Sequence, residues 1–361
     1  MSCRNADMDR FRILAINPGS TSTKLTLFQG NKDVISRNIE HPNRDLSESK
    51  RIVDQLGMRE GAVRAFMQEN SISELDAVAG RGGLLRPVQG GTYRVNDAMC
   101  RDLEEARYGE HASNLGPLLA RRFGKMIGAP AYIVDPVSVD EYEPSSRISG
   151  VPSIERKCRT HALNIKSVAR RCAGEMGKTI GNTNFVVAHL GGGISVCALA
   201  GGKIIDSTDA LLGEGPFSTE RAGTLPLAGV IDLCFDRGLS RKEVQSFLSR
   251  QSGFKGYIGT DRLTDVLEKI KAGDAPAELI FGAMVRQTVK WIGAMIALLR
   301  GSPNAVILTG GMVKSELLAK EICAHIEPMA AVRLYPGEFE MEALAEGVLR
   351  VLVNEEAALE Y

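Results

Sequence analysis

Two stretches of the sequence share one pattern: residues 13–28 read ILAINPGSTSTKLTLF, and residues 185–200 read FVVAHLGGGISVCALA. Each places a turn of glycine and hydroxyl residues between two strand-like runs. A turn without bulky side chains lets backbone N–H groups approach and hold phosphate oxygens. One such turn is a weak signal, because an ordinary glycine hairpin has the same composition.

The two stretches stand about half a chain apart and can be aligned. A shift of 173 residues places Gly19 on Gly192 and Ser22 on Ser195. Because successive glycines cost conformational entropy, the triplet in the second turn indicates a close approach between its backbone and a ligand. We therefore expect a duplicated domain that grips one phosphorylated ligand between its halves.

Length, charge and cysteine content limit the class of protein. The 361 residues predict two domains, since a domain usually has about 100–200 residues. Lysine plus arginine and aspartate plus glutamate number 44 each, so we expect no basic field that attracts nucleic acid. The seven cysteines are an odd number without a CxxC pair, which argues against a disulfide framework and a zinc site.

Two segments bear on cellular location. The first ten residues, MSCRNADMDR, lack the apolar core of a signal peptide. The apolar segment around Trp291–Leu299 is too short and too interrupted to span a bilayer, so the helix predicted over 278–300 is expected to be buried. We expect a cytoplasmic protein with reduced thiols and no membrane partner.

Strand-like runs alternate with helical ones along the chain, which predicts an α/β fold. The second copy of the strand–turn–strand pattern begins after a helix that follows His161. We therefore expect an N-terminal domain of residues 1–160 plus 341–361 and a C-terminal domain of residues 161–340.

Charged residues and glycines beside strand ends are candidate ligand-binding groups. Arg81 and Asp135 each follow a short strand-like run, and Gly310-Gly311 follows another. In α/β folds, ligands bind at the carboxyl ends of strands. Arg221 lies in a loop rich in turn residues, where an arginine can face a ligand. A surface arginine or a helix-start turn has the same local sequence, so none of these positions is decisive alone.

Four motifs follow one another along the chain: NPGSTSTK at 17–24, AHLGGGIS at 188–195, DALLGEGPFSTERAGTLP at 209–226 and LTGG at 308–311. Together they resemble the acetate and butyrate kinase family, within the sugar kinase, Hsp70 and actin superfamily. The resemblance extends over residues 11–353, with the motifs in the family's order. It implies a duplicated actin-like ATPase (ribonuclease H-like) fold, with two domains around a nucleotide cleft: an N-terminal carboxylate side and a C-terminal nucleotide side.

Within this family the chain is most similar to the butyrate kinases. Arg81 is followed by Gly82 and Gly83, where acetate kinases have bulky residues. The stretches GEHASNLG (109–116) and RKCRTHALN (156–164) also have the butyrate kinase form. Missing side-chain volume beside a carboxylate-binding arginine would leave room for a longer or branched acyl tail.

The resemblance assigns roles to the residues that match the family's motifs. The residues implied in catalysis are Arg81, Asp135, His161 and Arg221. The residues implied in binding the ATP phosphates and adenosine are His189, Gly191, Gly192, Gly193, Ser195, Gly310 and Gly311. Mg²⁺ is implied beside Asn17, Asp135 and Glu340, with Glu338 and Glu342 as alternatives to Glu340. The residues implied beside the acyl group are Gly82, Gly83 and His111.

The implied reaction moves the γ-phosphoryl group of ATP to a short-chain fatty acid and gives an acyl phosphate and ADP, reversibly. Butanoate is the expected acid, with branched acids such as isobutyrate included, and acetate or propionate is the alternative. A non-catalytic nucleotide-binding switch of the same fold is the alternative of another class. No serine lies in a GxSxG motif, which argues against a serine hydrolase. We also expect a homo-oligomer, a dimer or higher.

Overall fold

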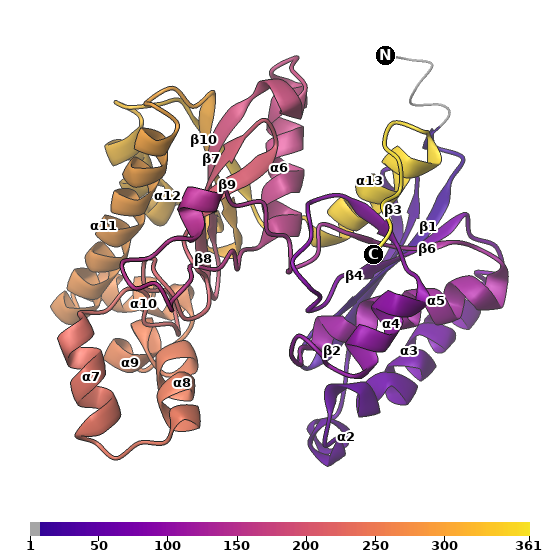
Figure 1. Cartoon of the computed structure of the whole chain (residues 1–361), viewed down its shortest axis with the longest axis horizontal. Helices are drawn as coiled ribbons and strands as arrows, with labels where there is room; N and C mark the ends of the chain where they lie inside the picture. The colour runs from indigo at the N-terminus through magenta and orange to yellow at the C-terminus, as the bar shows by residue number, and fades with distance from the viewer. Residues whose placement is uncertain (1–7) are drawn as a thin grey trace. The chain divides into compact units, whose positions relative to one another are not determined.

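The computed structural model describes residues 8–361, which form two compact units (Figure 1). Unit 1 contains the residues up to Val139 and the C-terminal segment Phe339–Tyr361, and unit 2 is Asp140–Glu338. Of the features predicted above, Cys3 and the start of the N-terminal stretch lie outside the described residues. The six described cysteines are free thiols, as expected.

Unit 1 is built on a six-stranded sheet with the order β3-β2-β1-β4-β6-β5. Its strands are β1 (Arg12–Pro18), β2 (Ser22–Gln29), β3 (Lys32–Glu40), β4 (Ala77–Arg81), β5 (Thr92–Arg94) and β6 (Ala131–Val134). Its helices are α2 (Asn43–Glu48), η1 (Ile52–Gln55), α3 (Leu56–Glu69), α4 (Asp97–Glu104), η2 (Ala112–Asn114), α5 (Leu115–Ile127) and α13 (Glu340–Leu352). Leu14 and Ile16 of β1 pack with Phe66 of α3 and Phe123 of α5 in the core of this unit.

Unit 2 is built on a five-stranded sheet with the order β11-β10-β7-β8-β9. Its strands are β7 (Asn184–Leu190), β8 (Ile194–Ala200), β9 (Lys203–Ser207), β10 (Ala305–Gly310) and β11 (Val332–Pro336). Its longer helices are α6 (Ala162–Glu175), α7 (Leu227–Phe235), α8 (Arg241–Arg250), α9 (Gly253–Ile258), α10 (Leu263–Lys271), α11 (Ala275–Leu298) and α12 (Glu316–Ile326). Its 3-10 turns are η3 (Pro144–Arg147), η4 (Ile180–Asn182) and η5 (Gly311–Lys314).

The two sheets repeat one topology, as the paired turns predicted. In unit 1, β1, β2 and β3 form an antiparallel meander, and β4 and β6 continue parallel to β1. In unit 2, β7, β8 and β9 form the same meander, and β10 and β11 continue parallel to β7. Both meanders also shift register between their second and third strands, at Leu27/Phe28 and at Ala198/Leu199.

The register of the two hairpins corrects the alignment of their turns. The last pair of the first hairpin is Pro18↔Thr23, and that of the second is Leu190↔Ile194, so the second turn is one residue shorter. No single shift can therefore align both strands of both hairpins. The two hairpins can be aligned on the register shift that follows Leu27 in the first and Ala198 in the second. In this alignment the pair Asn17↔Lys24 corresponds to the pair His189↔Ser195. Gly19 then no longer corresponds to Gly192.

The division into units falls at other residues than the expected 160/161 and 340/341. The segment 140–160 lies in unit 2 because its charged and polar groups bind there. Lys166 Nζ lies 2.7 Å from Glu141, the Tyr142 hydroxyl donates to the Ser207 carbonyl at 2.9 Å, and Arg156 pairs with Asp206 at 2.7 Å. Sequence patterning locates helices and strands, but it does not reveal these side-chain pairs.

The long helix α11 corrects one expectation and supports another. It has 24 residues and is, among residues 8–361, the one helix long and apolar enough to cross a membrane by length and composition. The expectation that this segment is too short to span a bilayer is therefore wrong. Its expected burial holds for one face, where Phe281 and Ile292 pack with Val186 of β7 and Val306 of β10.

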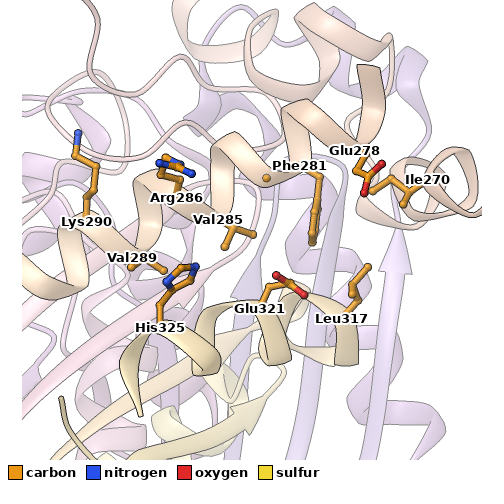
Figure 2. A pocket seen from close by; sticks show the side chains of 11 residues that line it. Ile270, Glu278, Phe281, Val285, Arg286, Val289, Lys290, Leu317, Glu321 and His325 are labelled. Atoms are coloured by element: carbon orange, nitrogen blue, oxygen red, sulfur yellow. The ribbon is translucent and has the colours of Figure 1, made fainter. Parts of the chain in front are cut away.

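Beside α12, α11 lines a groove of about 520 Å³ with both apolar and charged side chains (Figure 2). Arg286 and Lys290 of α11 and Glu321 and His325 of α12 stand along this groove. A helix with one apolar face in a core and one charged face is typical of a globular α/β unit.

Candidate active site

In unit 1, three predicted site residues come together at one edge of the sheet. Asn17 lies near the end of β1, Arg81 ends β4, and Asp135 directly follows β6. These strands are parallel neighbours, with Ile16 beside Gly80 and Arg81 beside Val134, so their carboxyl ends meet. This is the edge at which α/β sheets bind ligands.

The first residue of α13, Glu340, lies at the same edge. The Asn17 side-chain amide donates to Glu340 Oε2 at 2.9 Å, and Arg81 Nη1 pairs with the same oxygen. The Arg81 and Glu340 side chains are only 17% and 13% exposed. Of the three candidate acids, Glu340 is thus the one in contact with Asn17 and Arg81, whereas the Glu342 side chain is exposed.

Asp135 is held in an unusual backbone conformation. Its φ is 37°, in the left-handed region that non-glycine residues rarely adopt, and its side chain is 1% exposed. The Asp135 carboxylate accepts from the Gly91 N–H at 2.8 Å, and its own N–H donates to the Gly91 carbonyl at 2.9 Å. Asp135 therefore lies at the predicted edge and fixes the chain that leads into β5.

The two glycines after Arg81 serve close packing. A Cβ atom at Gly82 would overlap Pro136, and one at Gly83 would stand 2.5 Å from the Asn114 side-chain oxygen. The missing side chains therefore leave no free volume for an acyl tail at these two positions. Gly83 contacts η2, whose N-cap is His111, so the structure does bring the glycines and the His111 segment together.

Arg59 is a site-shaping residue that sequence reasoning missed. It is 0% exposed and lies on α3 below the first turn, where it donates to the Gly19 and Ser22 carbonyls at 2.8 Å each. It also donates to the Gln55 side chain at 2.9 Å, and burial lowers its pKa to about 10. A signal was present, because Arg59 falls at helical spacing on the apolar face that carries Leu56.

In unit 2, the predicted loop of Arg221 is fastened to the second glycine turn. The Ser218 hydroxyl donates to the Gly192 carbonyl at 2.6 Å. The Arg221 guanidinium lies against Gly193 so closely that a Cβ there would overlap Nη1. Nη1 donates to the Ala210 carbonyl, and Nε is buried without a hydrogen-bond partner.

The partly buried guanidinium of Arg221 points to an anionic ligand. Burial lowers its pKa, and none of the ion pairs among the described residues includes it. Arg159, which sequence reasoning missed, also has a buried Nε without a partner and pairs through Nη2 with Asp209 at 3.0 Å. Glu220 and Asp209 act on Arg221 electrostatically without forming an ion pair with it, and a phosphoryl group would bind the guanidinium directly with matching fork geometry.

Two histidines stand beside the glycine turn. His161 precedes α6 and lies with Nδ1 2.9 Å from the Ser195 hydroxyl. His189, near the end of β7, is 1% exposed, and its Nε2 lies 3.2 Å from where a Gly191 Cβ would stand. The structure thus brings the expected catalytic residue His161 together with His189 and Ser195, which are expected to bind the nucleotide.

The Gly310-Gly311 pair lies at the end of β10, next to β7. Gly310 has φ 99°, and a Cβ there would overlap the Leu190 carbonyl, so no larger residue fits. Gly311 is exposed and begins η5. The strand pairing places them next to the β7 residues around His189, and none of these residues lines the groove of Figure 2.

A sequence profile described as the Acetokinase family matches residues 153–336. The chain belongs to the acetokinase family. This family assignment places it among phosphotransferases that act on a carboxyl group. The profile contains the second glycine turn and the Arg221 loop, which are the parts of unit 2 described above.

Solved structures similar to this acetokinase-family chain agree on the fold. The Porphyromonas gingivalis acetate kinase is 18% identical with a TM-score of 0.77, covering 95% of this chain and 100% of that one. A Francisella tularensis propionate kinase is 19% identical with a TM-score of 0.72, covering 93% and 98%. The Entamoeba histolytica acetate kinase is 17% identical with a TM-score of 0.74, covering 93% and 98%. The predicted duplicated actin-like ATPase fold is confirmed.

The donor set in unit 1 fits the Mg²⁺ that the acetokinase family implies. Mg²⁺ takes oxygen ligands, usually one or two carboxylates, and keeps several waters. The Glu340 carboxylate and the Asn17 side-chain amide each carry such oxygens, and the two side chains are in contact through the Asn17 amide nitrogen. Among residues 8–361 there is no cluster of three or more His, Cys, Asp and Glu side chains that could form an all-protein metal cage.

Proposed function

We propose that this acetokinase-family chain phosphorylates a short-chain fatty acid, preferably butanoate, with ATP. The observation that carries the proposal is the Arg221 guanidinium, which packs against Gly193 and has a buried Nε without a hydrogen-bond partner. A group of this kind suits the charge on a phosphoryl group in transfer.

The proposed chemistry needs no general base. A fatty acid has a pKa close to that of glutamate, roughly 4.3, so its carboxylate is ionised at neutral pH. One carboxylate oxygen forms a bond to the γ-phosphorus of ATP as the bond from that phosphorus to the bridging oxygen breaks. The products are the acyl phosphate and ADP, and the same steps run in reverse.

Each proposed residue then has a role that its surroundings support. Arg81 binds the carboxylate, and Arg221 with His161 donates to the transferred phosphoryl group. The turn at Gly191–Gly193 holds the ATP phosphates through its N–H groups, and Gly310-Gly311 contacts the adenosine. Glu340 and Asn17 would hold Mg²⁺, which neutralises phosphate charge when bound.

Butanoate is proposed over acetate or propionate on the sequence resemblance at 109–116 and 156–164. The filled volume beside Gly82 and Gly83 removes one physical argument for a longer acid, so chain length must be measured. A hydroxamate-trapping assay on acids of two to five carbons, including isobutyrate, tests this choice. Highest kcat/KM on butanoate or isobutyrate supports it, and highest kcat/KM on acetate or propionate contradicts it.

A non-catalytic nucleotide switch is the alternative of another class. Arg221→Ala separates the two, because an enzyme would lose turnover while it kept ATP binding. Absence of turnover with every acid in the unmodified protein would favour the switch. We further propose a cytoplasmic homo-oligomer that binds neither nucleic acid nor membrane, and light scattering of the purified protein tests its subunit number.

A further inference from the structure

A buried chain of hydrogen bonds in unit 2 leads from a backbone carbonyl to His189. The Thr309 hydroxyl lies 3.3 Å from the Gly337 carbonyl oxygen. The Asn164 amide nitrogen lies 3.1 Å from the Thr309 hydroxyl and 2.9 Å from His189 Nδ1. Asn164 and Thr309 are 0% exposed and His189 is 1% exposed, so their polar groups must find partners inside the protein.

The direction of every bond in this chain follows from its first member. A carbonyl oxygen only accepts, so the Thr309 hydroxyl must donate to Gly337. Thr309 Oγ1 then accepts from Asn164, which fixes the amide with its nitrogen toward Thr309. The same nitrogen faces His189 Nδ1 and can only donate, so Nδ1 is the acceptor and carries no proton.

The ring proton of His189 therefore sits on Nε2, the nitrogen that faces the glycine turn at Gly191. A second proton on Nδ1 would make that nitrogen a donor too, and it would then face the donor nitrogen of Asn164, which is unfavourable. The chain thus holds His189 neutral and directs its N–H toward the turn.

We propose that Asn164 is a positioning residue which, with Thr309, locks His189 as its neutral Nε2–H tautomer. The Nε2–H then donates to a phosphate oxygen at the glycine turn. The identity of that ligand as ATP rests on the proposed function, whereas the tautomer does not. A turn that binds phosphate needs a donor at this position, because an unprotonated Nε2 would repel the oxygen.

Nitrogen-15 NMR of histidine-labelled protein reads the tautomer directly, and the chain has only five histidines. His189→Gln assigns the His189 signals. We expect an unprotonated Nδ1 and a protonated Nε2 in the unmodified protein without ligand. A protonated Nδ1 overturns the proposal, whatever the enzyme's activity.

Two variants test whether Asn164 sets this state. Asn164→Asp places a carboxylate oxygen opposite Nδ1, so the proton is expected to move to Nδ1. If Asn164→Asp does not fold, Asn164→Leu replaces it as the test, because leucine has a similar volume and carries no charge. Asn164→Leu is expected to give a mixture of the two tautomers. An unchanged tautomer in the folded variants overturns the proposal.

Asn304→Leu is the matched control. It removes the 2.7 Å hydrogen bond that Asn304 Oδ1 accepts from the Asn184 N–H. This bond lies at the opposite end of β7 and β10 from His189 and Thr309, so the variant is expected to leave the His189 tautomer unchanged. With ATP and the preferred acid, Asn164→Leu is expected to lower kcat/KM for ATP about 10²-fold, and KM for the acid to stay near its normal value. If no acid is turned over, the proposed function fails and the NMR result still decides the tautomer.

Discussion

The imidazole rings of His161 and His189 are stacked, with centroids 3.9 Å apart and planes 10° apart. Two stacked imidazolium ions would repel each other, so at most one ring is expected to carry a charge. The proposed tautomer of His189 is neutral, so it places no positive charge against the ring of His161. Its Nδ1 faces the Ser195 hydroxyl, and the stack holds the ring beside the glycine turn.

Replacing His161 should affect turnover far more than nucleotide binding. We expect His161→Gln to lower kcat about 10²-fold, the order observed when one aligned donor to a transition state is lost. ATP affinity, measured by calorimetry, should change little because the glycine turn remains. His325→Gln, on α12 in the same unit, is the control and should keep normal kcat. Equal losses in kcat and ATP affinity would contradict a role confined to transfer.

Gly193 should tolerate no side chain. A Cβ at this position would overlap Arg221 Nη1 and stand 3.0 Å from the Ala210 carbonyl oxygen. Gly193→Ala is therefore expected to displace Arg221 and to lower kcat about 10²-fold, as small misplacements of catalytic groups do. Gly174→Ala, in α6 with no atom within 4 Å of the new methyl, should leave kcat unchanged. A crystal structure of Gly193→Ala with Arg221 in place would refute this explanation.

Much of the site was predictable because its residues lie where chain patterns change. Arg81 and Asp135 were placed at strand ends by short apolar runs followed by glycine or proline, and parallel neighbours bring such ends together. The glycine triplet marked the turn of unit 2, and its three residues form the loop between β7 and β8. These signals are local, so a single sequence contains them.

The residues that were missed act over distances that local patterns do not encode. Asn164 looks like an unremarkable polar residue near a helix start, and only the packing of α6 on β7 and β10 brings it to His189 and Thr309. The one-residue difference between the two turns was also invisible, because it is set by strand pairing. The prediction of space for an acyl tail beside Gly83 was wrong because Asn114, 31 positions further along the chain, fills that space.

Glu340 should determine the metal requirement. Glu340→Gln removes the carboxylate that fits Mg²⁺ and breaks the ion pair with Arg81. The Mg²⁺ concentration for half-maximal activity is expected to rise about tenfold, equivalent to about 1.4 kcal/mol. Glu342→Gln, an exposed acid in the same helical turn, should leave it unchanged. The same Mg²⁺ dependence in both variants would remove Glu340 from the metal site.

The buried thiol of Cys158 should make stability fall at alkaline pH. Burial raises the pKa of Cys158 from 9.0 to about 12. Because the folded pKa is the higher one, this contribution is complete below pH 9 and is lost as the pH rises toward 12. Urea unfolding between pH 8 and pH 10.5 should show a steeper decline for the unmodified protein than for Cys158→Ser, by up to about 1.4 kcal/mol per pH unit. If the free energy of unfolding falls equally with pH in both proteins, the pKa of Cys158 is not higher in the folded state than in the unfolded state.

Arg59 should support both stability and activity, through the first turn. Arg59→Met leaves the Gly19 carbonyl without its 2.8 Å donor, and each buried acceptor that loses its partner costs about 1–3 kcal/mol. Removing the buried charge offsets part of this, so we expect the free energy of unfolding to fall by about 2 kcal/mol. Arg64→Met, an exposed arginine on the same helix, should change it by less than about 1 kcal/mol.

The activity of the Arg59 variants separates a structural role from a positioning one. Only Pro18 separates Asn17 from the turn that Arg59 holds, so a loosened turn should also move Asn17 relative to Glu340. Arg59→Lys keeps the charge, but a single ammonium group cannot reproduce the fork that spans the Gly19 and Ser22 carbonyls. If positioning matters, Arg59→Lys should lower kcat by at least as large a factor as Arg59→Met. Normal kcat in a destabilised Arg59→Lys protein would mean that the arginine only stabilises the unit.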